Sequence, residues 1–408
     1  MPGENVDDPL VPVDDPLAPV DDPLEEIDRL AGDLRRRGVE RIHTLAWRDL
    51  DDPDAGGSEV HADEFLRRWA VAGLVVTHRT SAAVGRPATA RRNGYEVVRR
   101  GGRHSVFPRA IVAEATGRMG RSDALVEIWN GVPWFSPIWY RRPRITFLHH
   151  VHGPMWDQIL PGPLASFGRA LETRVAPPFY RGGTTVTPSD ATREELLEIG
   201  FRADDVVAVP NGTDPRFSPG GTKNEHPSVV AVARLAPVKR FGLLLDAVAA
   251  ARVAVPDLTV TIVGDGPDAP ELRRRAAELG AEDWIEFTGR IEHDDLVDRY
   301  RRAWIVASAS LAEGWGLSLS EAAGCGTPAV ATDIRGHRSS VVDGVTGLLA
   351  EPHDLADAMV RVLTDGELRR RLGDAAQRRV AVMSWDATAA GVLAELHRVV
   401  AARDRAGG

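Results

Sequence analysis

Two glutamates flank a glycine turn in the stretch ASASLAEGWGLSLSEAAGCGTPAVAT, which runs from Ala307 to Thr332. Glu313 precedes the turn and Glu321 follows it, and the residues around them are mostly apolar or small. A buried carboxylate without a partner is costly, so each of these groups calls for one. Carboxylates accept hydrogen bonds from neighbouring hydroxyls, and this chemistry suits the hydroxyls of a sugar.

Two cations frame another loop, VARLAPVKR, in which Arg234 and Lys239 follow a predicted strand. The chain has 50 basic residues, and only Lys223 and Lys239 among them are lysines. A pair of cations at the end of a strand suits the charges of a diphosphate. The alternative is a pair of solvated surface cations. We expect no particular role for Lys223, which lies in a Pro/Gly-rich stretch.

Backbone groups of the glycine turn would add to this site. Gly314 and Gly316 let backbone N–H groups approach a ligand closely, and a helix is predicted to begin just after them. The N-terminus of that helix favours an anion. Carboxylates for hydroxyls and positive charge for phosphates together predict a sugar nucleotide as the ligand. The alternative for Glu321 is an ordinary acid near a helix N-terminus.

The elements that must position these residues form two successive βα series. The predicted strands lie at 42–47, 74–80, 124–130, 144–150, 227–235, 258–266, 284–290, 303–310 and 327–333. Segments with helical periodicity lie between them, such as residues 58–73. This alternation predicts an α/β fold with two Rossmann-like, doubly wound domains that face each other across a cleft.

The composition sets the broad class and the division into domains. A chain of 408 residues with 43% hydrophobic residues predicts more than one globular domain. The predicted parts are a disordered acidic tail at 1–30 with three VDDPL repeats, an N-terminal domain at 31–208, a linker at 209–227, a C-terminal domain at 228–383 and a final helix at 384–408.

The balance of charges and the single cysteine bear on partners and location. With 50 basic and 59 acidic residues, the chain is not expected to bind nucleic acid. Cys325 is the only cysteine, which fits a reducing compartment. No apolar run approaches the roughly 18 residues that a membrane helix needs. We therefore predict a cytoplasmic protein.

The stretch EGWGLSLSE resembles the E-x7-E motif of retaining GT-B glycosyltransferases of the family-4 type. Other segments match that family in the same order, among them VARLAPVKRFGLLLDAV, TIVGDGPDAPELR and EAAGCGTPAVATD. The resemblance runs from about Arg41 to the C-terminus. It implies a hexosyltransferase that uses a nucleotide diphosphate sugar, with no metal and no other cofactor. It also implies that the helix beginning near Trp385 crosses back to the N-terminal domain, which binds the acceptor.

The resemblance assigns roles to the residues described above. Glu313 would contact the hydroxyls of the donor sugar and Glu321 those of the ribose. Arg234 and Lys239 would hold the diphosphate as it leaves. The residues that would offer backbone N–H groups to sugar and phosphate are Gly314, Trp315, Gly316 and Leu317. The implied reaction is a front-face displacement with retention, in which the leaving phosphate takes the acceptor proton.

A glycine pair in the N-terminal half, Gly56 and Gly57, precedes a predicted helix for which Ser58 is the expected N-cap. The motif is similar to the glycine loop with which the family approaches the donor phosphates; the alternative is a plain turn. The aspartates just before it, at 51, 52 and 54, raise the question of a metal, which the family typically does not use.

Three histidines follow a predicted strand in FLHHVHGPMWDQ. The family usually places one histidine at this strand end, near the reacting centre. His149 is the best match and His150 the next, and His152 is a candidate for the acceptor side. The family often has a glycine after its lysine, whereas this chain has Arg240.

The acceptor, whether glycan, lipid or small molecule, is not identified by any motif. Between Arg86 and Arg109 the chain has seven arginines and one acid. This segment is a candidate for peripheral contact with the inner face of a membrane; a solvated basic face is the alternative. The main alternative function is a sugar phosphorylase or synthase on the same fold, which would use a sugar phosphate. An oxidoreductase is disfavoured because IVGDGP lacks the third glycine of a dinucleotide motif.

Overall fold

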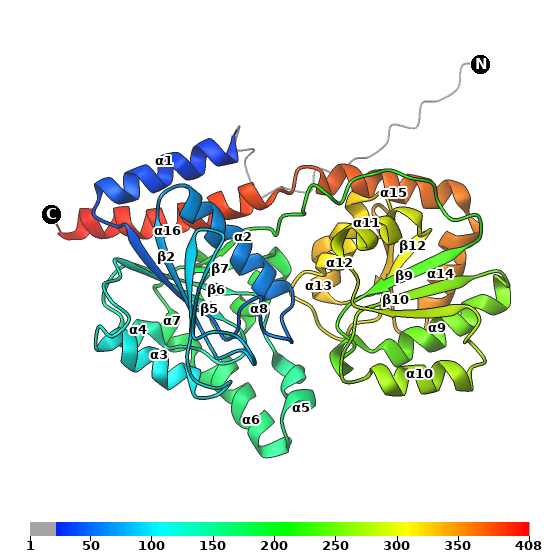
Figure 1. Cartoon of the computed structure of the whole chain (residues 1–408), viewed down its shortest axis with the longest axis horizontal. Coiled ribbons are helices and arrows are strands. Elements are labelled where there is room, and N and C mark those ends of the chain that lie inside the picture. The colour runs from blue at the N-terminus through cyan, green and yellow to red at the C-terminus, as the bar shows by residue number, and fades with distance from the viewer. Residues whose placement is uncertain (1–21, 408) are drawn as a thin grey trace.

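The computed structural model describes residues 22–407, which form two α/β domains side by side (Figure 1). The strands of the first domain are β1 (Arg41–Leu45), β2 (Val75–Thr80), β3 (Thr89–Arg92), β4 (Tyr95–Arg99), β5 (Ala124–Trp129), β6 (Arg144–Leu148), β7 (Thr185–Thr187) and β8 (Val206–Ala208). The strands of the second are β9 (Ser228–Val232), β10 (Thr259–Val263), β11 (Ile285–Gly289), β12 (Ile305–Ser308), β13 (Ala329–Thr332) and β14 (Gly347–Ala350).

Helices cover both sheets. Those of the first domain are α1 (Pro23–Arg36), α2 (Gly57–Val71), α3 (Val106–Ala115), α4 (Ser136–Trp139), α5 (Trp156–Ile159), α6 (Gly162–Ala170), α7 (Pro177–Tyr180), α8 (Asp190–Glu198) and the last helix, α16 (Trp385–Gly407). Those of the second are α9 (Phe241–Ala254), α10 (Ala269–Glu278), α11 (His293–Arg302), α12 (Leu317–Gly324), α13 (Arg335–Ser340), α14 (Leu355–Thr364) and α15 (Gly366–Val380).

The order of the strands fixes where a ligand can bind. The first sheet runs β3-β4-β2-β1-β5-β6-β7-β8, and every neighbouring pair is parallel except β3 with β4. The second runs β11-β10-β9-β12-β13-β14 and is parallel throughout. The order reverses between β1 and β5, and between β9 and β12. Open sheets bind ligands at such switch points, outside the carboxyl ends of the strands. The predicted fold class is confirmed.

The structure adds strands that the sequence analysis missed. β3 and β4 form a hairpin inside the arginine-rich segment, and their turn is Asn93-Gly94 with φ of 45° and 94°. Asn-Gly is the favoured pair for such a turn, so a recognisable signal was present. β7, β8 and β14 have only three or four residues each, too few for alternation of apolar and polar residues to reveal them.

Residues 23–30 belong to helix α1 and not to a disordered tail, so that part of the prediction is wrong. The Asp22 side chain accepts from Leu24 N at 2.9 Å and caps the helix, and Pro23 occupies its first turn, where proline is tolerated. The apolar residues that follow lie at helical spacing and are buried: Ile27, Leu30, Ala31 and Leu34. The repeats before residue 22 lie outside the described residues.

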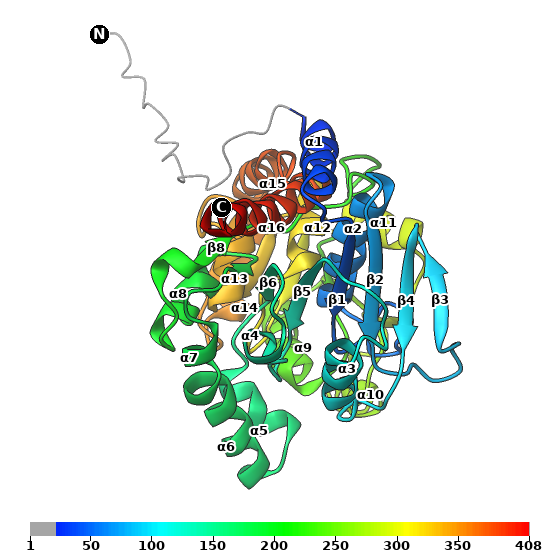
Figure 2. The ribbon, with the colours of Figure 1, turned by 90° about the vertical axis from the view of Figure 1, so that its left-hand side faces the viewer.

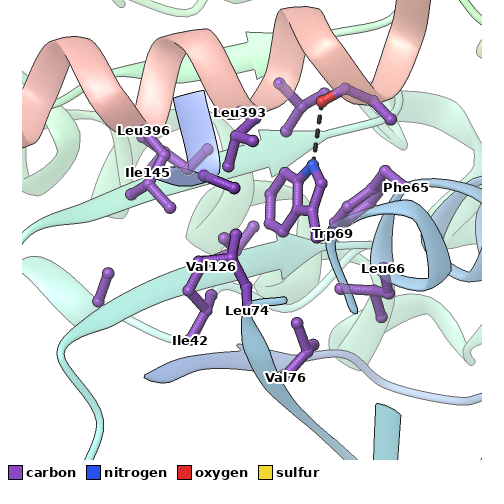
Figure 3. Packing of buried hydrophobic residues seen from close by; sticks show 14 of the residues in the cluster. Ile42, Phe65, Leu66, Trp69, Leu74, Val76, Val126, Ile145, Leu393 and Leu396 are labelled. Carbon is purple, nitrogen blue, oxygen red and sulfur yellow. Dashed lines mark hydrogen bonds between the residues drawn. The ribbon is translucent and has the colours of Figure 1, made fainter. Parts of the chain in front are cut away.

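Helix α16 lies against α1 and α2 and completes the core of the first domain (Figures 1 and 3). Its Leu393 and Leu396 join Val126 of β5 in one apolar cluster around Trp69. The Trp69 indole N–H donates to the carbonyl of Ala389 at 3.0 Å, so its polar atom is satisfied within the core.

Two chain segments cross between the domains and pack against each other. Thr213 N donates to Met383 O at 2.9 Å, and Thr388 Oγ1 donates to Pro210 O at 2.7 Å. A side chain at Gly212 would lie 2.2 Å from the backbone nitrogen of the residue facing it, so only glycine fits there. The crossing therefore depends on a close approach of two backbones. Within residues 22–407, no helix is both long and apolar enough to cross a membrane.

Trp69→Ala tests the role of α16 in the first domain. The substitution leaves a cavity and an unpaired carbonyl, and we expect it to lower the free energy of unfolding by about 3–5 kcal/mol in urea titrations. The control is Val71→Ala on the same helix, where the side chain is 84% exposed and the change should be below about 0.5 kcal/mol. Equal stability of the two variants would contradict this packing.

Candidate active site

Lys239 and Glu313 form an ion pair at the switch point of the second sheet. Lys239 Nζ donates to Glu313 Oε1, and Ser310 Oγ donates to the same oxygen at 2.8 Å. The lysine ends the loop after β9, and the glutamate lies in the loop after β12, the neighbouring strand. The two side chains are 22% and 16% exposed. The structure thus brings together two residues that the sequence placed in separate motifs.

The charge of Glu313 depends on its neighbours. Burial raises the pKa of this carboxyl. Electrostatic interactions with Lys239 and with the nearby His337 lower the pKa by more, so the net pKa is below the usual value. Glu313 is therefore ionised at neutral pH. An ionised carboxylate is a strong acceptor for hydroxyl groups.

Two residues that the sequence analysis missed support the Glu313 loop. The buried His337 has Nδ1 at 2.7 Å from Thr332 O and Nε2 at 3.1 Å from Ser308 Oγ. A Cβ on the preceding residue, Gly336, would lie 2.1 Å from Glu313 O. Helix α13 can therefore approach the loop only because a glycine stands there. Neither residue belongs to a local motif that links it to Glu313.

Arg240 follows Lys239, at the position where the family often has a glycine. Its φ is 48°, in the left-handed region where glycine is favoured. In return, its guanidinium donates to Ala309 O at 2.8 Å and Ser310 O at 2.9 Å. These hydrogen bonds offset backbone strain of about 1–2 kcal/mol. They also tie the loop after β9 to the loop that carries Glu313.

Glu321 lies within α12, as the sequence predicted, and has a partner that the sequence did not reveal. The hydroxyl of the fully buried Tyr300, on α11, donates to Glu321 Oε2 at 2.9 Å. Burial raises the pKa of the Glu321 carboxyl to about 7, although the Tyr300 hydrogen bond lowers it. Tyr300 lies 21 residues earlier on another helix, so only the fold brings the pair together.

Arg234 lies at the boundary between the domains, where it meets an acid of the first domain. Its Nη1 is 3.4 Å from Asp54 Oδ1. Close by, Arg290 Nη2 donates to Pro53 O at 2.5 Å. The loop before Gly56 therefore contacts the second domain through cations, and a diphosphate at Arg234 would have to compete with Asp54.

The aspartates before the glycine pair have arginine partners. Arg92 and Arg99 approach Asp51 to 2.6 and 2.5 Å, and Arg99 also lies 2.6 Å from Asp49. These arginines come from the segment 86–109, whose charge is thus partly neutralised inside the first domain. The other five arginines, Arg86, Arg91, Arg100, Arg103 and Arg109, are exposed, so most of the segment fits the alternative of a solvated basic face.

The glycine pair caps α2 differently from the prediction. Gly56 is the N-cap, and the Glu59 side chain accepts from Gly56 N at 2.7 Å. Ser58 lies inside the helix, and its hydroxyl is 3.2 Å from the amide nitrogen of Asn130, at the end of β5. The correction follows from Glu59, whose side chain reaches back to Gly56 N, so the helix begins two residues earlier than predicted.

Glycines of both domains meet the opposite domain. A Cβ on Gly57 would lie 3.0 Å from Leu317 Cδ1, and one on Gly314 would lie 2.5 Å from His149 O. The switch points of the two sheets therefore face each other in close contact. The Trp315 side chain is buried and donates to Ser320 Oγ at 2.9 Å, so Trp315 has only its backbone to offer a ligand.

The structure favours His150 over His149 as the histidine that faces the second domain. His149 Nε2 is 3.3 Å from His61 Nδ1, and the His149 ring packs on Phe147 inside the first domain. His150 instead interacts electrostatically with Glu313 and Lys239. Its Nε2 has no hydrogen-bond partner in the described part of the chain. His149 Nδ1 also lacks a hydrogen-bond partner among the described residues, so the choice between the two histidines stays a prediction.

The two histidines are uncharged at neutral pH. Burial lowers the pKa of His150 to about 3 and takes the pKa of His149 well below its ordinary value. His150 stacks on the ring of His152 with centroids 4.5 Å apart. A neutral imidazole at the cleft can donate or accept a hydrogen bond but brings no charge.

Glu172 holds the loop that carries these histidines. This fully buried acid lies on a π-helical turn (Leu171–Val175) and accepts from His152 N at 2.9 Å, Gly153 N at 3.1 Å and Trp156 Nε1 at 3.0 Å. Such turns often mark functional sites. The sequence offered no signal for this acid, because its partners precede it by 16 to 20 residues.

Lys223, for which we expected no role, has a structural one. Its Nζ donates to Ala303 O at 2.8 Å and to Thr327 Oγ1 at 2.6 Å, which fastens the linker to the second domain. Burial of the ammonium group lowers the pKa of Lys223 to about 8. Both lysines of the chain thus have defined partners.

Comparison with known proteins agrees with this fold. Residues 55–217 match the family described as Glycosyltransferase Family 4, and residues 214–379 match Glycosyl transferases group 1. The D-inositol 3-phosphate glycosyltransferase of Kribbella flavida is 30% identical over an alignment of 415 residues. The alignment includes 88% of this chain and 95% of that protein. The chain therefore belongs to the family-4 type of GT-B glycosyltransferases, and it is an enzyme that transfers glycosyl groups.

A second relative and two solved structures are also similar to this chain. The D-inositol 3-phosphate glycosyltransferase of Corynebacterium glutamicum is 40% identical over 226 residues, 49% of this chain and 54% of that one. Sucrose-phosphate synthase from Thermosynechococcus elongatus superposes with a TM-score of 0.72 at 21% identity, covering 86% and 97% of the two chains. Anabaena Alr3699/HepE in complex with UDP-glucose superposes with a TM-score of 0.68 at 20% identity. The match covers 87% of this chain and 98% of that chain. These likenesses confirm the GT-B fold.

The raised pKa of Glu321 predicts how stability depends on pH. The unfolded chain loses this proton near pH 4.5, whereas the folded protein keeps it until about pH 7. The stability that the neutral carboxyl contributes is therefore lost as the pH rises through this window. Glu321→Gln is neutral at every pH. Between pH 4.5 and about 7, its free energy of unfolding in urea should therefore fall by about 1–3 kcal/mol less than that of the wild type.

The control for this experiment is Glu278→Gln, which changes an exposed glutamate of α10. Its stability should follow the wild type at every pH. If Glu321→Gln shows the same pH dependence as the wild type, Glu321 does not retain its proton in the folded protein.

Proposed function

We propose that the protein transfers a hexosyl group from a nucleoside diphosphate sugar to a hydroxyl of an acceptor, with retention of the anomeric configuration. The observation that carries the proposal is the Lys239–Glu313 ion pair at the switch point, beside the N-terminus of α12. It offers a cation for a diphosphate and a carboxylate for sugar hydroxyls at one place. The complex of Anabaena Alr3699/HepE with UDP-glucose supports a donor of this class.

Each group would have a separate part in holding the donor. Lys239 and Arg234 would bind the phosphate oxygens, and the N-terminus of α12 would add partial positive charge. Glu313 would accept hydrogen bonds from the sugar and Glu321 from the ribose. Because these cations supply the positive charge, we propose that the reaction needs no metal and no further cofactor.

The chemical step would be a displacement on one face of the sugar. The bond from C1 to the β-phosphate oxygen breaks, and the acceptor oxygen bonds to C1 on the same side. The acceptor proton passes to the leaving phosphate oxygen. The residues named here would act by positioning and by stabilising the charge of the departing diphosphate. Neutral His150 would donate or accept a hydrogen bond at the sugar without adding charge.

The acceptor is to be sought in the cleft side of the first domain. Because relatives are named D-inositol 3-phosphate glycosyltransferase, D-inositol 3-phosphate is the first acceptor to assay.

NMR analysis of the product tests the stereochemistry. The product should have the same anomeric configuration as the donor, read from the coupling of the anomeric proton. An inverted product would overturn the proposed stereochemistry and leave the donor site untouched.

Calorimetric titration with UDP, GDP and ADP tests the donor site without an acceptor. One of these nucleotides should bind, and Lys239→Ala should weaken that binding by about 10- to 100-fold, because a charge-assisted hydrogen bond contributes about 1.5–3 kcal/mol. The control is Arg274→Ala, an exposed arginine of α10, which should bind like the wild type.

Failure of all three nucleotides to bind would overturn the sugar-nucleotide proposal. The phosphorylase alternative would then be tested with sugar 1-phosphates. Binding that survives unchanged in Lys239→Ala would place the diphosphate elsewhere.

A further inference from the structure

A row of exposed apolar side chains runs along the helical segment from Gly162 to Tyr180, which joins α6, the π-helical turn and α7. Leu164 is 54% and Phe167 65% exposed. The row is completed by the half-buried Leu171 and two further exposed residues; its members are Leu164, Phe167, Leu171, Val175 and Phe179. Spacings of three and four residues place them on one face of the helix. We call this set the apolar stripe.

The face next to the stripe is firmly packed, so the stripe is not exposed through loose folding. Ala165, Gly168 and Ala176 are buried. A Cβ on Gly168 would lie 2.7 Å from the Trp156 ring. The one acid of the segment, Glu172, also faces inward and is fixed by the three N–H donors described above. A helix that buries its glutamate and exposes its phenylalanines reverses the usual pattern, and such a surface indicates a partner.

The exposed charge beside the stripe is positive. From Asp157 to Gly183 the charged residues are Asp157, Arg169, Glu172, Arg174 and Arg181; Glu172 is buried, and the exposed Asp157 pairs with Arg169. Arg174 and Arg181 are exposed. The whole chain has a net charge of −9, so this surface has the opposite sign to the protein as a whole. Large apolar side chains flanked by arginines fit an anionic bilayer surface.

The stripe also lies where a flat surface can reach it. Both views show α5 and α6 projecting below the rest of the molecule (Figures 1 and 2). In Figure 1 this projection is on the side of the first domain that faces the second. A projecting helix can enter the interfacial layer, about 5–10 Å deep, while both domains stay in water.

We propose that the apolar stripe docks the protein on the surface of an anionic phospholipid bilayer, with α6 lying in the interface. This surface differs from the segment 86–109, in which Arg92 and Arg99 pair with aspartates. The proposal does not depend on the donor or the acceptor, and its test needs no catalytic activity.

The test is co-sedimentation with vesicles of phosphatidylcholine alone, and with vesicles of equal parts phosphatidylglycerol and phosphatidylcholine. The wild type should bind the mixed vesicles, and Phe167→Asp should reduce the bound fraction about tenfold, because a charge replaces an inserting ring. Arg174→Glu should weaken binding at low salt and have less effect at high salt. Val253→Asp, at an exposed valine of α9, is the matched control and should bind like the wild type.

Three results would overturn the proposal. The first is no binding of the wild type to the mixed vesicles. The second is equal binding of Phe167→Asp and the wild type. The third is a dimer in sedimentation equilibrium that Phe167→Asp dissociates, which would make the stripe a contact between copies of this chain. Because Phe167 is exposed, the variant should fold, and circular dichroism and the urea transition check this directly.

Discussion

A lysine and a glutamate share a largely buried site at the boundary between the domains, and the lysine keeps the glutamate charged. Without Lys239, burial would favour the protonated form of Glu313. The pair also joins the loops after two adjacent strands, and Arg240 ties the same loops by binding the carbonyls of Ala309 and Ser310. In the proposed reaction, a diphosphate that binds Lys239 would therefore act directly on Glu313, the group that we propose contacts the sugar.

Small residues and an ion pair bring the two domains into close contact. Gly314 lets the loop that carries Glu313 approach the carbonyl of His149. Gly57 lets the start of α2 approach Leu317. Arg234 meets Asp54 across the same boundary. Contacts of this kind can separate at modest cost, which would suit the admission and release of a ligand between the domains.

The sequence was sufficient for the elements that follow from local periodicity and for motifs carried by one loop. It identified Glu313 and Lys239 separately, but not their pairing, because only the order of β9 and β12 in the sheet places their loops together. Neighbouring residues of an extended chain point to opposite sides, so the choice between His149 and His150 depended on the exact end of β6. Tyr300 and Glu172 act through partners on other elements, where no local pattern points to them.

The most direct test of the central claim is a double-mutant cycle on Lys239→Met and Glu313→Gln, measured by calorimetry with the nucleoside diphosphate that binds and with its glucose conjugate. The account predicts that Lys239→Met weakens both ligands by about tenfold or more, whereas Glu313→Gln weakens only the sugar conjugate. Bare nucleotide should bind Glu313→Gln as well as the wild type or more tightly. An equal loss for both ligands in Glu313→Gln, or no loss in Lys239→Met, would contradict the separate roles of the two residues.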